Sequence, residues 1–107
     1  MITIDDFKKL EIRIGKVVSA EKVAESKKLL RLIFDFGSEQ RQILAGISES
    51  FPDPSVLVGK EMPVLVNLEP RELMGYKSEG MIVAADADDG PVLLHPEREV
   101  LPGSIVG

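Results

Sequence analysis

The sequence predicts a small all-β protein whose strands close into a barrel. Several short stretches are rich in β-branched and other apolar residues that alternate with polar ones. Turn residues, mainly glycine, proline, aspartate and serine, separate these stretches, and helical patterns are almost absent. The length of 107 residues fits a single domain that spans residues 1–107.

The chain opens on a short helical turn. Asp5 or Asp6 can cap a turn over residues 7–10, because a carboxylate accepts the free backbone N–H groups at a helix start. One turn is too short to persist alone, so we expect it to pack on another part of the protein.

Residues 12–20 (IRIGKVVSA) have the composition of a first strand. A period of two places Ile12, Ile14 and Val18 on one face. Gly15 lies inside this stretch and predicts a bulge or a tight bend, which a strongly curved sheet needs.

The next two stretches predict an antiparallel pair. Residues 28–36 form a strand, residues 37–38 turn the chain, and residues 40–45 return as its partner. The side chains expected to face inward from the first of these strands are Leu30, Leu32, Phe34 and Phe36.

A single interruption separates the third strand from the fourth. Pro52 and Pro54 exclude a central strand from residues 47–59, so we expect a loop with one helical turn. Residues 62–68 (MPVLVNL) then resume the strand pattern. The side chains expected to face inward there are Met62, Val64, Val66 and Leu68.

The last third of the chain alternates between turns and short strands. Residues 69–79 predict a polar loop, and residues 80–85 predict a buried strand that is apolar on both faces. Residues 86–90 form a turn before a short strand over 91–94, and residues 105–106 end the chain as an apolar pair. A five-stranded OB barrel, plugged by the interruption between strands three and four, fits this order, with a short N-terminal helix and a C-terminal extension. A β-sandwich is the alternative.

The composition argues against catalysis and against metal binding. Cysteine is absent and His95 is the only histidine, so the chain has no thiolate metal site and no multi-histidine cluster. His95 stands between Leu94 and Pro96 on a short strand, where no Ser-His-Asp set can be built. We therefore expect a protein without catalysis, metal or cofactor. Without cysteines, an export signal or a long apolar stretch, we also expect a cytoplasmic protein that does not bind membranes.

The net charge of −5 hides an asymmetry. Residues 82–107 hold five acidic residues and one arginine, whereas residues 1–81 hold the other twelve basic residues. Some of these could form a local basic face beside strands two and three, the surface by which OB barrels bind oligonucleotides or oligosaccharides. Solvated surface charges are the alternative. The candidates are Lys27, Lys28, Arg31, Arg41, Arg71 and Lys77.

Aromatic residues are scarce. The chain has no tryptophan, four phenylalanines and a single tyrosine, Tyr76, which the predicted loop carries and which could stack on a base. Any recognition of nucleic acid should therefore depend on phosphates and shape more than on an aromatic platform.

Several segments together resemble the tRNA-binding domain family. The most specific are Asn67-Leu68-x-Pro70-Arg71 and Gly75-x-x-Ser78-x-Gly80-Met81. Similar segments cover residues 6–17, 26–29, 35–37, 41–47 and 101–104, so the resemblance extends over nearly the whole chain. This family includes domains appended to methionyl-tRNA synthetases, free-standing tRNA-binding proteins and CsaA-type export chaperones.

The resemblance implies an OB barrel, often a homodimer, that binds tRNA by shape without catalysis and holds or delivers it for a methionyl-tRNA synthetase catalytic subunit. It implies a set of RNA-binding residues: Lys28, Arg41, Asn67, Arg71, Ser78 and Met81. The periodicity instead places Met81 in a strand core.

A second reading within the family stays open. Residues 41–46 and 80–85 look like those of the tRNA binders, whereas residues 4–7, 75–79 and 92–96 look more like those of the export chaperones. The alternative function is therefore that of a dimeric CsaA-type chaperone that binds unfolded peptides. We favour the tRNA reading because its features fall on the expected binding strands.

The two ends of the chain predict self-association. Neither end has an obvious place in a small barrel core: residues 2–10 form a turn that is too short to persist undocked, and residues 100–106 present Val100, Leu101, Ile105 and Val106. Exposed together they would form a large apolar patch, which a two-fold dimer would cover. The alternative is a monomer in which both ends pack on their own barrel.

Overall fold

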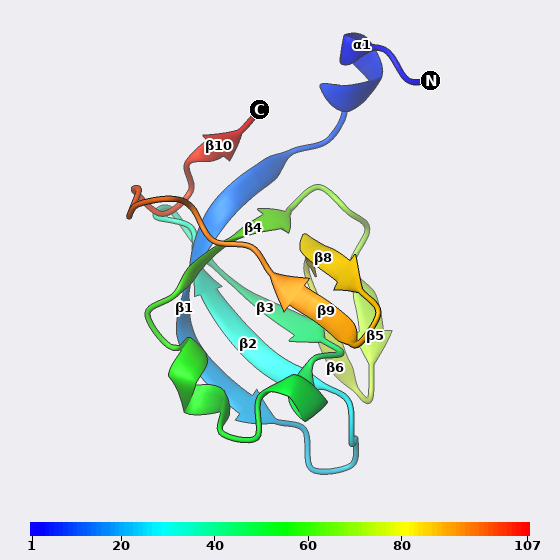
Figure 1. Cartoon of the computed structure of the whole chain (residues 1–107), viewed down its shortest axis with the longest axis vertical. Coiled ribbons are helices and arrows are strands. Elements are labelled where there is room, and N and C mark those ends of the chain that lie inside the picture. Colours follow the sequence, from blue (N-terminus) through cyan, green and yellow to red (C-terminus); the bar gives the residue numbers. More distant parts are fainter.

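The computed structural model describes all 107 residues. Its regular elements are short strands, one helical turn and two 3-10 turns, joined by loops (Figure 1). The elements are α1 Ile4–Phe7, β1 Ile12–Lys22, β2 Leu30–Asp35, β3 Gln40–Ala45, η1 Ser48–Ser50, η2 Pro54–Leu57, β4 Glu61–Leu65, β5 Arg71–Leu73, β6 Tyr76–Ser78, β7 Met81–Ile82, β8 Ala84–Ala87, β9 Gly90–Leu93 and β10 Ile105–Val106. The predicted all-β class is confirmed.

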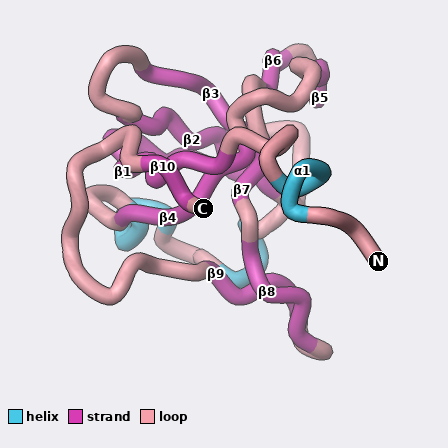
Figure 2. The backbone as a smooth tube through the Cα atoms, turned by 90° about the horizontal axis from the view of Figure 1, so that it is seen from above, coloured by secondary structure: helices cyan, strands magenta, loops and turns pink.

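One antiparallel sheet with the order β3-β2-β1-β4-β7 forms the body of the molecule. The long strand β1 pairs with β4 through its first half, Ile12 to Lys16, and with β2 through its second half, Lys16 to Lys22. Because β1 pairs with one neighbour along its first half and with another along its second half, the sheet is strongly curved and β3 lies near β7. The result is a nearly closed five-stranded barrel (Figures 1 and 2), which confirms the predicted OB architecture.

The barrel interior is filled by one apolar cluster. Its members are Val17, Leu30, Leu32, Phe34, Phe36, Ile43, Ile47, Leu57, Met62, Val64 and Val66. Leu57 comes from η2, within the predicted interruption, and is only 1% exposed. Gly59 and Lys60, which follow it, bond to both backbone groups of Val17. The interruption therefore closes one end of the barrel, as expected.

The curvature of β1 has a different origin from the predicted one. The register shifts between Val17 and Ser19, so Val17 points into the core and Val18 is 40% exposed instead of buried. Gly15 lies in regular pairing; a Cβ there would lie 2.7 Å from the rings of both Phe34 and Phe36. The glycine is needed because two stacked aromatic rings lie against the backbone.

The N-terminal helix begins earlier than predicted. Thr3 is its N-cap, and Thr3 and Asp6 form a capping box in which each side chain accepts the other residue's backbone N–H. The hydrogen bond from the Thr3 N–H is the main cause that lowers the pKa of the Asp6 carboxyl, and Lys9 lowers it further. Asp6 thus lies within the helix as the capping partner and is not its first cap.

The chain between residues 66 and 87 differs most from the prediction. The expected polar loop contains the hairpin β5–β6, whose turn residues Met74 and Gly75 both have positive φ, 53° and 82°. The expected strand over 80–85 is two strands, β7 and β8, and β8 pairs with β9. Leu68, expected inward, is 39% exposed because β4 ends at Leu65. In Figure 2 the two hairpins extend from the barrel in different directions.

Both chain ends lie at one end of the barrel (Figure 1). Helix α1 has no buried residue, and β10 pairs with β1 alone. These end segments expose large apolar side chains: Met1, Ile2, Ile4, Leu10, Leu101, Ile105 and Val106. No helix in the structure is long and apolar enough to cross a membrane.

Candidate nucleic-acid interface

The hairpin β5–β6 is fastened beside strand β3. The Glu79 N–H donates to the Gln42 carbonyl at 2.9 Å, and the Gln42 side-chain amide donates to the Lys77 carbonyl at 2.9 Å. The Leu44 N–H donates to the Ser78 hydroxyl at 3.0 Å. These three bonds hold the hairpin along the open edge of β3, so the polar residues of both elements share one surface.

Ser78 lies under this surface and is 2% exposed. Its hydroxyl accepts the Leu44 N–H and donates to the Gly80 carbonyl at 3.3 Å. At Gly80, with φ 152°, a Cβ would lie 2.9 Å from the Leu65 carbonyl oxygen, so the chain passes close to β4. In this structure Ser78 fixes the hairpin to the barrel, with its hydroxyl turned into the protein.

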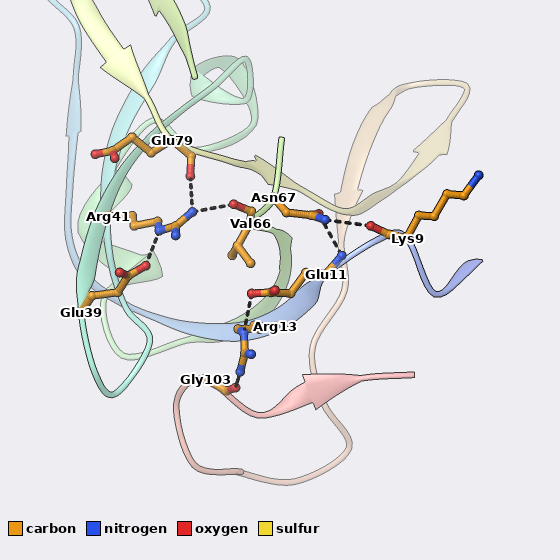
Figure 3. Close-up of polar contacts among 9 residues, drawn as sticks. All are labelled: Lys9, Glu11, Arg13, Glu39, Arg41, Val66, Asn67, Glu79 and Gly103. Carbon is orange, nitrogen blue, oxygen red and sulfur yellow. Dashed lines mark hydrogen bonds and ion pairs between the residues drawn. The ribbon is translucent and has the colours of Figure 1, made fainter. Parts of the chain in front are cut away.

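Arg41 joins the ends of three strands (Figure 3). One guanidinium nitrogen donates to the Val66 carbonyl at 2.6 Å and to the Glu79 carbonyl at 3.3 Å, and the Nε donates to the Glu39 carboxylate. Its side chain is 26% exposed. Arg41 also lines a polar hollow of about 280 Å³ with Arg13, so it has a solvent-facing side.

Asn67 uses both ends of its amide within the protein (Figure 3). Its Oδ1 accepts the Glu11 N–H at 2.8 Å, and its Nδ2 donates to the Lys9 carbonyl at 2.7 Å. Both partners belong to the segment between α1 and β1. Asn67 therefore connects the end of the barrel strand to the N-terminal segment.

Lys28, Arg71 and Met81 line two neighbouring hollows. Lys28 lies in a hollow of about 430 Å³, and Arg71 and Met81 lie in a mostly apolar one of about 260 Å³. The residues that both hollows share are Gly46, Ile47 and Pro91. A continuous groove therefore runs between the end of β3 and the hairpin β8–β9. The core position that the periodicity predicts for Met81 is wrong: β7 is a two-residue strand and Met81 is 44% exposed.

The six residues thus separate into groups. The groove gathers Lys28, Arg71 and Met81, whereas Arg41 and Asn67 lie at the Val66 end of β4 and Ser78 lies buried between β6 and β3. The exposed cations of the groove, Lys28 and Arg71, form no ion pair. No cluster of acidic and histidine side chains could hold a metal ion.

The structure also joins residues that the sequence leaves apart. Arg31 and Tyr76 are 45 positions apart, yet the Arg31 guanidinium lies over the Tyr76 ring. Gly75 is the one turn residue in the sequence between β5 and β6; Met74, which shares the turn with φ 53°, is not a residue that predicts a hairpin turn.

Comparison with known proteins identifies the family. Residues 12–105 match the family model described as "Putative tRNA binding domain". The chain belongs to this tRNA-binding domain family. It is 56% identical to the methionine–tRNA ligase of Archaeoglobus fulgidus over 105 residues, and 53% identical to that of Thermotoga maritima over 105 residues. Each match covers 98% of this chain and 16% of the ligase, so the chain spans about one sixth of these relatives.

Solved structures of this domain family have the same fold. A MetRS-related protein from Pyrococcus horikoshii is 39% identical with a TM-score of 0.93, and the match covers 100% of this chain and 98% of that one. The chaperone CsaA from Bacillus anthracis is 31% identical with a TM-score of 0.88, covering 100% and 99%. Both branches expected from the sequence are therefore close structural relatives.

Proposed function

We propose that residues 1–107 act as one domain that binds tRNA without catalysis. The observation that carries the proposal is the groove, where the exposed Lys28 and Arg71 form no ion pair, although Glu49 and Asp89 also line the hollow that holds Lys28. Unpaired cations attract the phosphate backbone without the loss of an internal ion pair. The similarity to methionine–tRNA ligases supports tRNA as the RNA bound, held or delivered for a methionyl-tRNA synthetase catalytic subunit in the cytoplasm.

The six residues have two kinds of role in this proposal. Lys28 and Arg71 contact phosphates, and Met81 packs against a sugar or base that enters the groove. Arg41 contacts RNA through the solvent-facing side of its guanidinium. Asn67 and Ser78 hold the binding elements in place, because their side-chain polar atoms bond within the protein.

A titration with bulk tRNA tests the proposal. Binding should weaken as salt rises, with a log–log slope of about 0.7 to 0.9 for each phosphate contact. Lys28→Glu and Arg71→Glu should weaken all tRNAs alike. Arg98→Glu is the matched control, because Arg98 is exposed and pairs with Glu97 on the C-terminal segment. Absence of tRNA binding at low salt, or affinity that salt does not change, would overturn the proposal.

The chaperone function is the second candidate, and a specific feature favours it. The hollow beside Met81 is mostly apolar and could accept the side chain of an extended peptide. A parallel titration with an unfolded, reduced polypeptide separates the two functions. Peptide binding that competes with tRNA would show that both ligands use the groove, whereas peptide binding alone would support the chaperone.

Self-association through the two chain ends completes the proposal. In a single copy of the chain, the apolar residues of α1 and β10 are exposed to water at one end of the molecule (Figure 1). A second copy that covers them in a two-fold dimer would remove this surface from water. Such a dimer would bring two grooves to one tRNA.

A further inference from the structure

The outer face of the β1–β2–β3 sheet carries a second cationic position beside the groove. Arg31 lies opposite Glu21 on β1 and opposite Leu44 on β3. Its Nε donates to the Gln42 Oε1 at 2.6 Å, and another guanidinium nitrogen pairs with Glu21. A guanidinium has five N–H donors, so three stay free for a ligand while the Gln42 contact fixes the direction of the plane.

The hairpin places the only tyrosine of the chain next to this guanidinium. The Arg31 Cζ lies 5.6 Å from the centroid of the Tyr76 ring, within the range of a cation–π contact. Tyr76 is still 36% exposed. Gln42 fixes both partners, because its side chain also donates to the Lys77 carbonyl next to Tyr76. A flat aromatic surface and a cation with free donors therefore lie side by side in a preformed arrangement.

The Glu21 carboxylate, which pairs with Arg31, can be replaced by another anion. The Glu21 side chain is 60% exposed, and ion pairs at such exposed positions contribute between zero and about 1 kcal/mol. A phosphate dianion or diester can therefore take the place of Glu21 without disturbing the fold. The Gln42 contact, by contrast, lies on the sheet and stays in place.

We propose that Arg31, Gln42 and Tyr76 form a subsite for a single unpaired nucleotide, whose base stacks on Tyr76 and whose phosphate binds Arg31. The proposal rests on the proposed function, since the nucleotide belongs to the bound tRNA. It adds a contact with an unstacked base to recognition that otherwise depends on phosphates and shape. Single-stranded loops and ends of RNA supply such bases.

Intrinsic fluorescence tests the stacking directly. The chain has one tyrosine and no tryptophan, so emission excited near 280 nm reports on Tyr76 alone. Saturation with tRNA should quench this emission, after correction for absorption by the RNA, with the same midpoint as fluorescence anisotropy of labelled tRNA. Saturated binding with unchanged tyrosine emission would overturn the proposal.

Variants separate the base from the phosphate. Tyr76→Phe should bind tRNA as the wild type does, and Tyr76→Ala should bind about 5- to 150-fold more weakly with an unchanged salt slope. Arg31→Gln should reduce the salt slope by about 0.7 to 0.9. Glu21→Gln should tighten binding by about 2- to 5-fold, because it removes the competing carboxylate. Arg98→Gln is the control, and melting curves exclude variants that do not fold.

These results distinguish the subsite from the proposed function. If wild-type protein binds tRNA but Tyr76→Ala binds equally well, the subsite is wrong and tRNA binding through the groove stands. If Tyr76→Phe binds as weakly as Tyr76→Ala, the ring does not act by stacking, which also overturns the subsite. If the wild-type protein does not bind tRNA, the proposed function fails first and the subsite fails with it.

Discussion

At the scale of single residues, the candidate RNA-binding residues differ in whether their side-chain polar atoms already form hydrogen bonds within the protein. Asn67 and Ser78 belong to the motifs by which the sequence resembles its family, and both use their side chains to connect segments. A side chain whose donors and acceptors are occupied contributes to RNA binding through the elements it positions. Lys28 and Arg71 have no such partners, so their contribution should be direct.

Replacement of Asn67 should loosen the N-terminal segment. Asn67→Ala removes two hydrogen bonds, to Lys9 and Glu11, and should lower the free energy of unfolding by about 1–3 kcal/mol. Amide hydrogen exchange at Glu11 should accelerate, because its N–H loses its acceptor. Leu68→Ala, next to it and exposed, is the control. A tRNA affinity that falls while the Glu11 amide stays protected would instead show that Asn67 contacts RNA.

Replacement of Ser78 should affect stability more than charge-dependent binding. Ser78→Ala leaves the buried Leu44 N–H without an acceptor, which should cost about 1–3 kcal/mol of unfolding free energy in urea denaturation. The salt slope of tRNA binding should not change, since no cation is lost. The exposed Ser38→Ala serves as the control. Unchanged stability together with weaker binding would contradict the positioning role.

At the scale of elements, the course of β1 depends on a missing side chain. Gly15→Ala would force a methyl group to within 2.7 Å of the Phe34 and Phe36 rings, so unfolding free energy should fall by about 1–3 kcal/mol. The double variant Gly15→Ala/Phe36→Leu should lose less than the sum of the two single-variant losses, because Phe36→Leu removes one of the two rings that the methyl group would meet. Thermal denaturation measures both single variants, Gly15→Ala and Phe36→Leu, and the double variant. Additive losses in the double variant would show that the strain does not arise from this contact.

The capping of α1 should depend on pH in the acid range. The pKa of Asp6 is lowered in the fold, chiefly by the Thr3 N–H, so its contribution is complete above the ordinary carboxyl pKa of about 3.9. It is lost as the pH falls through the lowered value. The Thr3 amide resonance should therefore shift only below about pH 4, and Asp6→Ala should abolish that shift. A transition near neutral pH would contradict this assignment.

The elements also show what the sequence could predict. The antiparallel pair predicted over 28–36 and 40–45 is confirmed as β2 and β3; β2 alternates buried and half-buried residues with a period of two, whereas β3 buries the neighbours Ile43 and Leu44. The β1 bulge was misplaced because one extra residue reverses the faces after Val17, and no residue type marks that position. The hairpin β5–β6 was missed because it does not pack into the core, so its strands carry no apolar alternation.

The candidate site was predicted less completely than the barrel, because the surface contacts that assemble it leave no apolar alternation in the sequence. The residue types of Lys28 and Arg41 followed from resemblance, and the strand that carries Arg41 followed from local pattern; Lys28, predicted to begin a strand, lies in the bend before β2. The meeting of Arg31 with Tyr76, and the grouping of Lys28 with Arg71, depend on how two surface hairpins fold onto the sheet. Such contacts between distant segments are set by tertiary packing, which has no periodic signature in the sequence.

At the scale of the whole molecule, the exposed chain ends predict a dimer of the 11.7 kDa chain. Leu101 and Ile105 are 82% and 62% exposed, so charging either one should leave the barrel stable and disrupt only a contact with a second copy. Light scattering at micromolar concentration should give twice the chain mass for the wild type and one chain mass for Leu101→Glu and Ile105→Glu. Val56→Glu, at a 53% exposed position on η2, should remain dimeric.

The same variants link assembly to function. Two copies on one particle double the number of free cations, and a second contact formed from within the complex raises the effective concentration of the groove. Monomeric Ile105→Glu should therefore bind tRNA about 100-fold more weakly than Val56→Glu, although neither substitution touches the groove. Melting temperatures within a few degrees of each other would show that both barrels are intact. A wild type of one chain mass would end the dimer hypothesis, and equal tRNA affinities would mean that one groove is sufficient for binding.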